Sequence, residues 1–395
     1  MGSYSNLYVD GYPILTEKNG YSVDLARRIF CEADYIEENR LLKEKNKITW
    51  GDVYDDEDGI ELFKGFRSTG RICRERLELF GIEYSKAKED YEATIGELKE
   101  AYDFLQNSGL SYEHYLETIK SIINSRHKEY SHDSEESFSS YLNENELIFE
   151  EQNALLALWS VLYVLDDDCT IEYDLTDIID SGWLENRSEL VNEKIIVFTE
   201  GKTDVEFIKI GIKRFFPYLY DYYHFMDFEN SKYEANASRL VHTVKSFVGS
   251  GIKNLIIAIF DNDSAAEKEI RNLKAVKLPP NIKVLKYPPI EWANDYPTIG
   301  PSGIQNMNIN GLAGSIEMYL GLDCLQENGT LIPIQWTGYM ETINQYQGSI
   351  LKKEEVQRRF REKASNIDVS TNSIENWREL ISIIELMNGI WKSTD

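Results

Sequence analysis

The sequence predicts two parts of different fold class: an α/β domain with a parallel four-stranded sheet, preceded by an α+β domain that is mostly helical. Two observations predict the α/β part. After Leu190, short apolar runs alternate with amphipathic helical segments, and these runs are apolar throughout rather than at every second position. That combination is typical of parallel strands covered by helices on both faces. Before Leu190, helical periodicity dominates and only one hairpin is evident.

The first half of the chain opens on the predicted hairpin. Apolar residues alternate on both sides of Asp10-Gly11, a pair that accepts the positive φ of a tight turn. Apolar residues spaced three to five apart then indicate helices over residues 79–107, 111–127 and 154–165. We expect the acidic stretch 166–182 to be the edge of this domain.

The second half alternates strands and helices. The apolar runs predict strands at 195–199, 222–228, 255–260 and 282–287, with helices at 205–216, 235–248 and 265–275. Helical periodicity returns at 354–364 and 374–390. We therefore expect a first domain over residues 1–188, an α/β domain over 189–325 and a helical C-terminal extension over 326–395.

Composition limits the classes of function. The chain has 395 residues and a formal net charge of −26, whereas a stand-alone non-specific nucleic-acid binder is usually basic. Any contact with nucleic acid is thus expected to be local, bridged by metal or assisted by a partner. Four widely separated cysteines without a CxxC pair suggest neither a zinc knuckle nor a disulfide framework. Without a signal peptide or a long apolar run, we expect a cytoplasmic protein that does not enter membranes.

Carboxylates follow two of the predicted strands. Glu200 follows the strand 195–199 in the segment EGKTD, and Asp261 and Asp263 follow the strand 255–260 in the segment DND. Ligands of open parallel sheets bind beyond the carboxyl ends of the strands, so these side chains should meet at one edge. Converging carboxylates repel one another unless a cation neutralises them, and oxygen-only ligands favour Mg²⁺ or Mn²⁺. Such a site can activate water and stabilise charge on a phosphate.

EGKTD followed by DND, each after an apolar strand, resembles the Toprim domain of topoisomerases, bacterial primases and OLD-family nucleases. The positions that match the pattern are Glu200, Gly201, Asp204, Asp261 and Asp263. The resemblance implies a Toprim-like α/β fold in which Glu200 is a metal ligand or general acid/base. It also implies that the two aspartates of DND hold the metal, so that the expected catalytic residues are Glu200, Asp261 and Asp263.

The opening segment MGSYSNLYVDGYPILTEKN resembles the start of the N-terminal domain of bacterial HEPN/Toprim-associated proteins, which are predicted defence effectors. In the Toprim branch a later helix carries another glutamate, which the segment GLAGSIEMYLG supplies as Glu317. Together the two resemblances imply the metal ligands Glu200, Asp204, Asp261, Asp263 and Glu317. They also imply a setting in anti-phage defence.

The same residues allow other interpretations. Glu200 and Asp204 can simply begin the helix that follows them, where acidic side chains suit the helix macrodipole. Asp263 can cap the next helix, a function compatible with metal binding, and Glu317 can be a solvated side chain.

Nucleic-acid contacts have few candidates in so acidic a chain. Lys202 follows Gly201 and can touch a phosphate, although a solvated lysine is the commoner case. The segment KKEEVQRRFREK over 352–363 is the one basic patch, and a charge run of this kind is usually a solvated face. Its candidate contacts are Lys352, Arg358, Arg359 and Arg361.

The favoured hypothesis is a Mg²⁺-dependent nuclease that cleaves phosphodiester bonds of RNA, including tRNA, or of DNA. A primase should carry a zinc module, and a type II topoisomerase needs further modules for which the chain lacks room. One alternative is a non-catalytic Toprim-like module that senses nucleotides or nucleic acid and acts through a protein partner; a homo-oligomer is also open. Another is a ribonuclease using Arg126 and His132, whose spacing is that of the HEPN motif with histidine as general acid/base.

Overall fold

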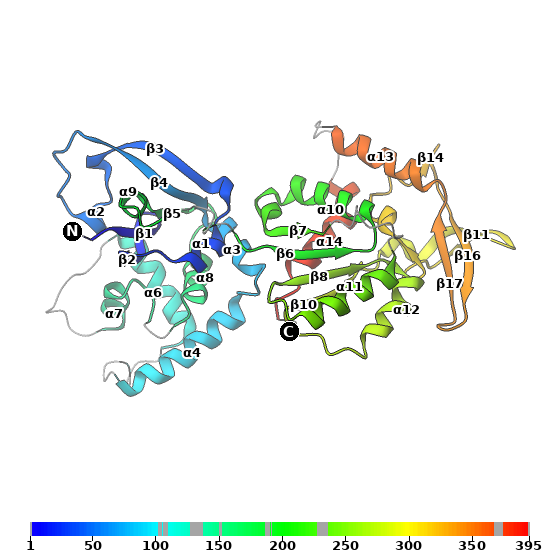
Figure 1. Ribbon diagram of the computed structural model, residues 1–395, viewed down its shortest axis with the longest axis horizontal. Coiled ribbons are helices and arrows are strands. Elements are labelled where there is room, and N and C mark those ends of the chain that lie inside the picture. The colour runs from blue at the N-terminus through cyan, green and yellow to red at the C-terminus, as the bar shows by residue number, and fades with distance from the viewer. Residues whose placement is uncertain are drawn as a thin grey trace. The chain divides into compact units, whose positions relative to one another are not determined.

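The computed structural model describes residues 2–101, 105, 110–126, 137–149, 152–185, 190, 192–226, 236–366 and 374–393. The chain forms two compact units, Met1–Glu193 with Trp391–Asp395 and Lys194–Ile390 (Figure 1). The boundary therefore falls slightly after the expected position 188. Residues 326–390 belong to the second unit, so they are not a separate extension.

The first unit contains a five-stranded antiparallel sheet in the order β2-β1-β5-β4-β3. Its strands are β1 (Tyr4–Val9), β2 (Tyr12–Lys18), β3 (Tyr35–Leu41), β4 (Ile60–Thr69) and β5 (Thr170–Asp174). The predicted hairpin is confirmed, with Asp10 at φ 51° and Gly11 at φ 79°. The expectation that 166–182 is a domain edge is wrong. This stretch contains β5, which lies between β1 and β4 because it buries Ile171 and Tyr173 at alternate positions.

Helices pack against this sheet and against one another. They are α1 (Val23–Ile29), α2 (Lys47–Trp50), α3 (Gly70–Glu78), α4 (Tyr84–Ala101), α6 (Tyr112–Ser125), α7 (Phe138–Glu144), α8 (Ala154–Val164) and α9 (Thr176–Asp180), with 3₁₀ turns η1 (Glu32–Asp34) and η2 (Leu42–Glu44). Helix α4 lies within the predicted range 79–107 but begins only at Tyr84, because Gly81, with φ 71°, separates it from α3. Helices α3, α4 and α6 all pack on α8.

The second unit is built on a four-stranded parallel sheet, as predicted. Its order is β10-β8-β6-β7, with β6 (Ile195–Thr199), β7 (Tyr223–Phe225), β8 (Ile256–Phe260) and β10 (Ile282–Lys286), and every pairing is parallel. All five residues of β8 are buried, which explains its continuous apolar run.

Helices cover both faces of the parallel sheet. Helices α11 (Ala237–Ser250) and α12 (Ser264–Leu273) pack on the face that carries Phe198, Ala258 and Phe260. Helices α10 (Lys202–Phe215) and α14 (Arg378–Asn388) lie on the other face (Figure 1). They pack so closely that a Cβ at Gly211 on α10 would stand 2.7 Å from Ile384 Cδ1 on α14.

A second, mixed sheet follows in the order β12-β11-β16-β17, with β11 (Tyr296–Gly300), β12 (Gly303–Met307), β16 (Ile334–Met340) and β17 (Gln345–Ile350). The remaining elements are β9 (Asn262–Asp263), β13 (Ala313–Gly314), β14 (Gln326–Glu327), β15 (Thr330–Leu331), α13 (Lys353–Ser365), η4 (Pro217–Tyr222), η5 (Glu291–Asp295), η6 (Ile316–Tyr319) and η7 (Ile374–Trp377). The expected helical extension thus begins with strands, since β14 to β17 precede α13. These strands are short or largely exposed, so they lack the apolar signal of buried strands.

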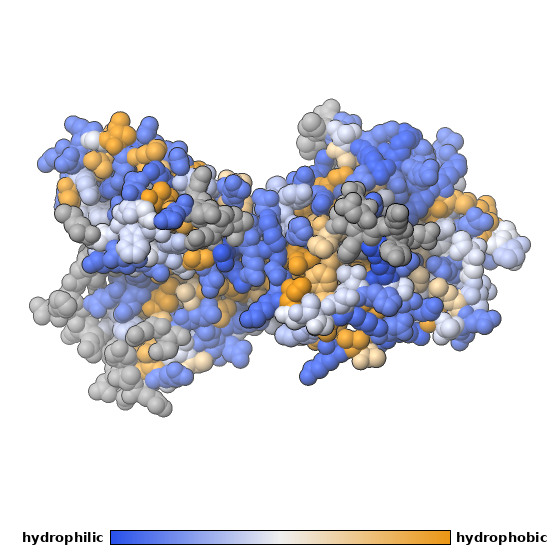
Figure 2. Space-filling model, in the orientation of Figure 1, coloured by the Kyte–Doolittle hydropathy of each residue, from blue (hydrophilic) through white to orange (hydrophobic). Residues whose placement is uncertain are grey.

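The visible face of each unit is mostly hydrophilic, with scattered apolar residues (Figure 2). This agrees with a chain in which 28% of the residues are charged. Among the described residues, no helix has both the length and the apolar composition that a membrane crossing requires.

Candidate metal centre

The carboxyl ends of β6 and β8 lie side by side. The parallel register pairs Thr199 with Ile259, and the backbone N–H of Asp261 donates a 2.9 Å hydrogen bond to Glu200 Oε1. The expectation that the two acidic segments meet at one sheet edge is therefore confirmed. The meeting follows from the parallel pairing alone, because both segments leave the sheet at the same end.

Asp204 lies in the first turn of α10 and is buried, with 5% of its surface exposed. The hydroxyl of Tyr287 donates a 2.5 Å hydrogen bond to Asp204 Oδ1. A Cβ at Gly201 would stand 2.7 Å from Asp204 Oδ2, so the glycine of EGKTD leaves room for this carboxylate. The sequence analysis missed Tyr287, although it directly follows β10 and therefore leaves the sheet at the same edge as Glu200.

The three residues of DND have three different functions. Asp261 Oδ1 is buried and has no hydrogen-bond partner among the described residues. Asn262 Oδ1 accepts the N–H of Gly311 at 3.0 Å, and β9 pairs with β13, which holds the following segment against the site. Asp263 Oδ1 accepts the N–H of Ala266 at 2.8 Å and caps α12. The capping interpretation of Asp263 is thus confirmed for one of its two oxygens.

Glu317 is fully buried, so the interpretation of a solvated side chain is wrong. It lies in the 3₁₀ turn η6 rather than in the expected helix. Its Oε1 accepts a 2.7 Å hydrogen bond from Gln357 Nε2, and its Oε2 accepts one of 2.7 Å from Ser315 Oγ. Lys353 Nζ is 3.3 Å from the same Oε2. Both Lys353 and Gln357 lie on α13 and were missed, because the sequence gives no sign that α13 reaches this site.

Burial disfavours the ionised form of each carboxyl group at the edge of the sheet. It raises the pKa of Glu200 to about 8 and that of Asp204 to about 6, and neighbouring carboxylates act in the same direction. The pKa of Asp261 lies well above its ordinary value because of burial and then of Asp204, Glu200, Asp263 and Glu317. All four other carboxylates therefore disfavour the ionised form of Asp261.

Two lysines of the protein, Lys353 and Lys286, partly offset this repulsion. Burial lowers the pKa of Lys353, but the nearby carboxylates of Glu317, Asp261 and Asp204 outweigh burial and raise it. Burial also raises the pKa of Asp263, while hydrogen bonds from the backbone N–H groups of Ala266 and Ala265 oppose that rise. Two ammonium groups act on five carboxyl groups, so the acidic side chains outnumber the cations.

The residues fit a divalent cation by their chemistry, although in the part of the chain that the structure describes no three His, Cys, Asp or Glu side chains form a complete ligand set. Four of the carboxylates instead accept local hydrogen bonds: Glu200 from the Asp261 N–H, Asp204 from Tyr287, Asp263 from the Ala266 N–H and Glu317 from Gln357. In the part of the chain that the structure describes, Asp261 Oδ1 is buried and accepts no hydrogen bond. Oxygen ligands of this kind suit Mg²⁺ or Mn²⁺.

Most of the side chains that were predicted to contact nucleic acid form ion pairs with carboxylates of the protein. Arg361 donates to both oxygens of Glu206 at 2.6 and 2.8 Å. The other patch residues also form ion pairs: Lys352 with Glu327, Arg358 with Glu355 and Glu362, and Arg359 with Glu355. Lys202 is exposed at the start of α10. The patch on α13 therefore has much of its positive charge balanced within the protein.

The alternative ribonuclease pair is described only in part. Arg126 is the residue that ends α6, with φ 51°, and it is exposed. His132 lies outside the described residues.

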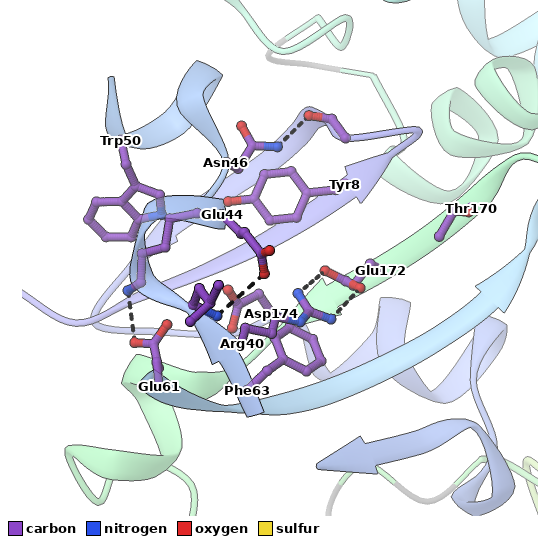
Figure 3. A pocket seen from close by; sticks show the side chains of 13 residues that line it. Tyr8, Arg40, Glu44, Asn46, Trp50, Glu61, Phe63, Thr170, Glu172 and Asp174 are labelled. Carbon is purple, nitrogen blue, oxygen red and sulfur yellow. Dashed lines mark hydrogen bonds and ion pairs between the residues drawn. The ribbon is translucent and has the colours of Figure 1, made fainter. Parts of the chain in front are cut away.

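A separate pocket of about 240 Å³ lies over the sheet of the first unit (Figure 3). Arg40 donates to both oxygens of Glu172 at 2.7 Å, and its guanidinium carbon is 3.4 Å from the centre of the Phe63 ring. Lys45 pairs with Glu61 at 2.8 Å. Both cations are already paired with carboxylates, and the lining also includes the carboxyl groups of Glu44 and Asp174. The pocket was not foreseen from the sequence.

Residues 1–197 match the family model described as HEPN/Toprim N-terminal domain 1. The first unit therefore carries a domain of this family, as the resemblance of the opening segment implied. The match ends before Glu200 and so does not include the carboxylates. No match was found among curated proteins or among solved structures.

Proposed function

We propose that the second unit is a Toprim-like, divalent-metal-dependent nuclease. The proposal depends mainly on the surroundings of Asp261. Its buried Oδ1 has no donor among the described residues, and four neighbouring carboxylates disfavour its ionised form. Five acidic side chains gathered at the end of a parallel sheet have no structural purpose that fewer could not serve. A cation at this edge removes the repulsion and gives the cluster a chemical function.

In this proposal Asp261 and the second oxygen of Asp263 would hold the metal, and Glu200, Asp204 and Glu317 would have to move closer to add further ligands. Mg²⁺ or Mn²⁺ supplies Lewis-acid stabilisation of phosphate charge and a more acidic water. Tyr287 fixes the orientation of Asp204 by its hydrogen bond. Asp263 keeps its cap on α12 through Oδ1 at the same time.

Glu200 is the candidate general acid/base. Its pKa of about 8 allows the carboxyl group to hold a proton near neutral pH and to exchange it during the reaction. The Asp261 N–H occupies Oε1, which leaves Oε2 as the oxygen that carries the proton. A bound cation would lower this pKa, so Glu200 would lose its proton more readily when the site is filled.

The substrate proposed is RNA, including tRNA, or DNA, and the setting is anti-phage defence in the cytoplasm. The HEPN/Toprim domain of the first unit supports this setting. Lys353 would present its ammonium to a phosphate oxygen beside Glu317. The more distant contacts are Lys202 and the patch residues Lys352, Arg358, Arg359 and Arg361, once their carboxylate partners are exchanged for phosphates.

A non-catalytic sensing module is the second candidate. It is favoured by the absence, among the described residues, of a complete ligand set. A nuclease assay separates the two. Wild type should cleave a mixed RNA and DNA substrate with Mg²⁺ or Mn²⁺, should stop in chelator and should recover on adding Mn²⁺. Glu200→Gln and Asp261→Asn should each lose at least about a hundredfold, the scale of a missing general acid or base. A folded protein that binds Mg²⁺ but cleaves neither substrate would support the sensing module.

A further inference from the structure

The mixed sheet of the second unit stands out by its lack of charge. Strands β11, β12, β16 and β17, whose residues the structure describes in full, contain no Asp, Glu, Lys, Arg or His. In the whole chain 28% of the residues are charged. Figure 2 shows pale and orange residues at the end of this unit, where Figure 1 draws β11, β16 and β17, beside the deep-blue surface of α13. The strands themselves therefore add no charge that repels a polyanion, although the exposed Glu341 lies in the turn between β16 and β17.

One face of this sheet carries a row of aromatic rings. The ring centres of Trp336 and Tyr346 are 5.8 Å apart, and those of Tyr346 and Tyr339 are 5.1 Å apart. The two tyrosines are 52% and 51% exposed. Cβ atoms built at Gly300 and Gly348 would stand 3.4 and 3.0 Å from the Trp336 ring, so glycines on both neighbouring strands let the indole pack closely on the sheet.

The row borders a pocket of about 220 Å³. Its polar lining is neutral, with Thr298, Ser302 and Gln305 beside the glycines Gly300 and Gly303. Pockets for drug-sized ligands measure roughly 300–1,000 Å³, so this one suits a single flat ring system. Aromatic faces with neutral hydrogen-bonding side chains are the means by which proteins hold unpaired bases.

We propose that this aromatic face, defined by Trp336, Tyr339 and Tyr346 with the adjoining pocket, binds unpaired bases of a single-stranded nucleic acid. The inference rests on the proposed nuclease function and names its substrate class. Stacking on aromatic rings contributes to base binding without requiring a cation at the face itself, which suits a chain with a net charge of −26.

The face belongs to the same framework as the carboxylates. Strand β17 packs against β13 and α12. Strand β13 pairs with the segment of Asp263, and Asp263 caps α12. A base held on the face is therefore positioned by the elements that fix the metal ligands, which is the arrangement a single-strand nuclease requires.

The test is equilibrium binding of a ten-nucleotide oligothymidine and a ten-nucleotide oligouridine, measured in chelator so that no cleavage occurs. Tyr346→Ala and Tyr339→Ala should each weaken binding about 5- to 150-fold, the equivalent of 1–3 kcal/mol per stacked base. Tyr346→Phe keeps the ring and should stay close to wild type. Tyr163→Ala, which removes a 47% exposed tyrosine of the first unit, is the matched control and should have no effect.

An oligonucleotide of the same length with abasic sites keeps the phosphates and should bind far more weakly. Because the face has no cation, the affinity should also fall little with salt, in contrast to the slope of about −0.7 per neutralised phosphate on single strands. Equal binding of the abasic strand, or wild-type affinity in both tyrosine-to-alanine variants, would overturn the inference. In that case concentration-dependent sedimentation that Tyr346→Ala abolishes would assign the face to a second copy of the chain.

These results are independent of the nuclease proposal. Binding that depends on Tyr346 without metal-dependent cleavage would refute the nuclease and keep the base-binding face. Cleavage that neither tyrosine variant affects would refute the face and keep the nuclease.

Discussion

Replacing Asp261 by Asn should abolish the pH-dependent effect of Mg²⁺ on the stability of the second unit. The substitution keeps the shape of the side chain and removes the charge that Glu200, Asp204, Asp263 and Glu317 all oppose. It also removes a proposed ligand, and Mg²⁺ tolerates few changes in its octahedral shell. Without metal, the variant should therefore be at least as stable as wild type, because one source of repulsion is gone.

The magnitude follows from Glu200, whose pKa rises from 4.5 to about 8 on folding. A raised pKa in the folded state stabilises the fold fully below pH 4.5, and this contribution is lost as the pH rises through about 8. At 1.36 kcal/mol per pKa unit, the metal-free wild type loses up to about 4 kcal/mol between pH 5 and pH 8. This figure counts Glu200 alone, and Asp204 and Asp261, whose pKa values are also raised, add to the loss as they titrate with it. For a unit of this size it corresponds to a fall in Tm of roughly 8–16 °C.

Bound Mg²⁺ replaces protons, so it should stabilise wild type more at pH 8 than at pH 5. At a concentration of about 100 times Kd, the gain is roughly 2.7 kcal/mol. The assay is calorimetry at both pH values, with Mg²⁺ or chelator, following the transition of the second unit. Glu385→Gln, an exposed carboxylate on α14, is the control and should respond as wild type does. An equal Mg²⁺ response in wild type and Asp261→Asn would refute the metal assignment.

Three further predictions test single contacts. Tyr287→Phe leaves the buried Asp204 without its donor and should lower the free energy of unfolding in urea by about 1–3 kcal/mol, whereas no change would mean that water replaces the hydroxyl. Asp263→Asn keeps a good N-cap and should lose only metal-dependent activity, while Asp263→Ala should lose about 1 kcal/mol of stability as well, measured by the same unfolding curves. Arg126→Ala and His132→Ala should leave nuclease activity within a few-fold of wild type, and a loss of about a hundredfold would place the chemistry in the first unit.

The part of the site that could be predicted from the sequence is the part fixed by parallel pairing. Glu200 and Asp261 each follow a strand that is apolar throughout, and such strands share a sheet whose carboxyl ends face one way. The prediction did not require the order of the strands in the sheet. Residues that follow parallel strands leave the sheet at the same edge, whether or not the strands are neighbours.

The contacts made by α13 could not be predicted in this way. Lys353 and Gln357 contact Glu317 although they lie 36 and 40 residues further along the chain. The apolar periodicity of a sequence predicts a helix, but it does not predict which turn the helix packs against. The basic patch drew attention to α13 for its charge. The two residues of α13 that contact Glu317 are Lys353 and Gln357. They are the sequence neighbours of Lys352 and Arg358, which were predicted to contact nucleic acid.

Strands with an exposed face were missed for a related reason. Strand β4 buries only three of its ten residues and carries charged residues between them, so its apolar pattern is weak. Strand β16 buries only Ile334, and its aromatic residues lie among polar neighbours. An antiparallel or mixed sheet that faces solvent needs few apolar residues, and its strands are then recognised only by their partners.

The two aspartates of DND differ in the hydrogen bonds that their side-chain oxygens accept. From the sequence, Asp263 is a candidate both for capping and for metal binding, since a carboxylate directly after a strand suits either function. In the structure Asp263 Oδ1 is committed to the cap of α12, whereas Asp261 Oδ1 is buried without a donor. A capping residue has no reason to bury an oxygen that accepts nothing, because the cost of an unsatisfied buried acceptor is about 1–3 kcal/mol. The metal that we propose would satisfy this oxygen.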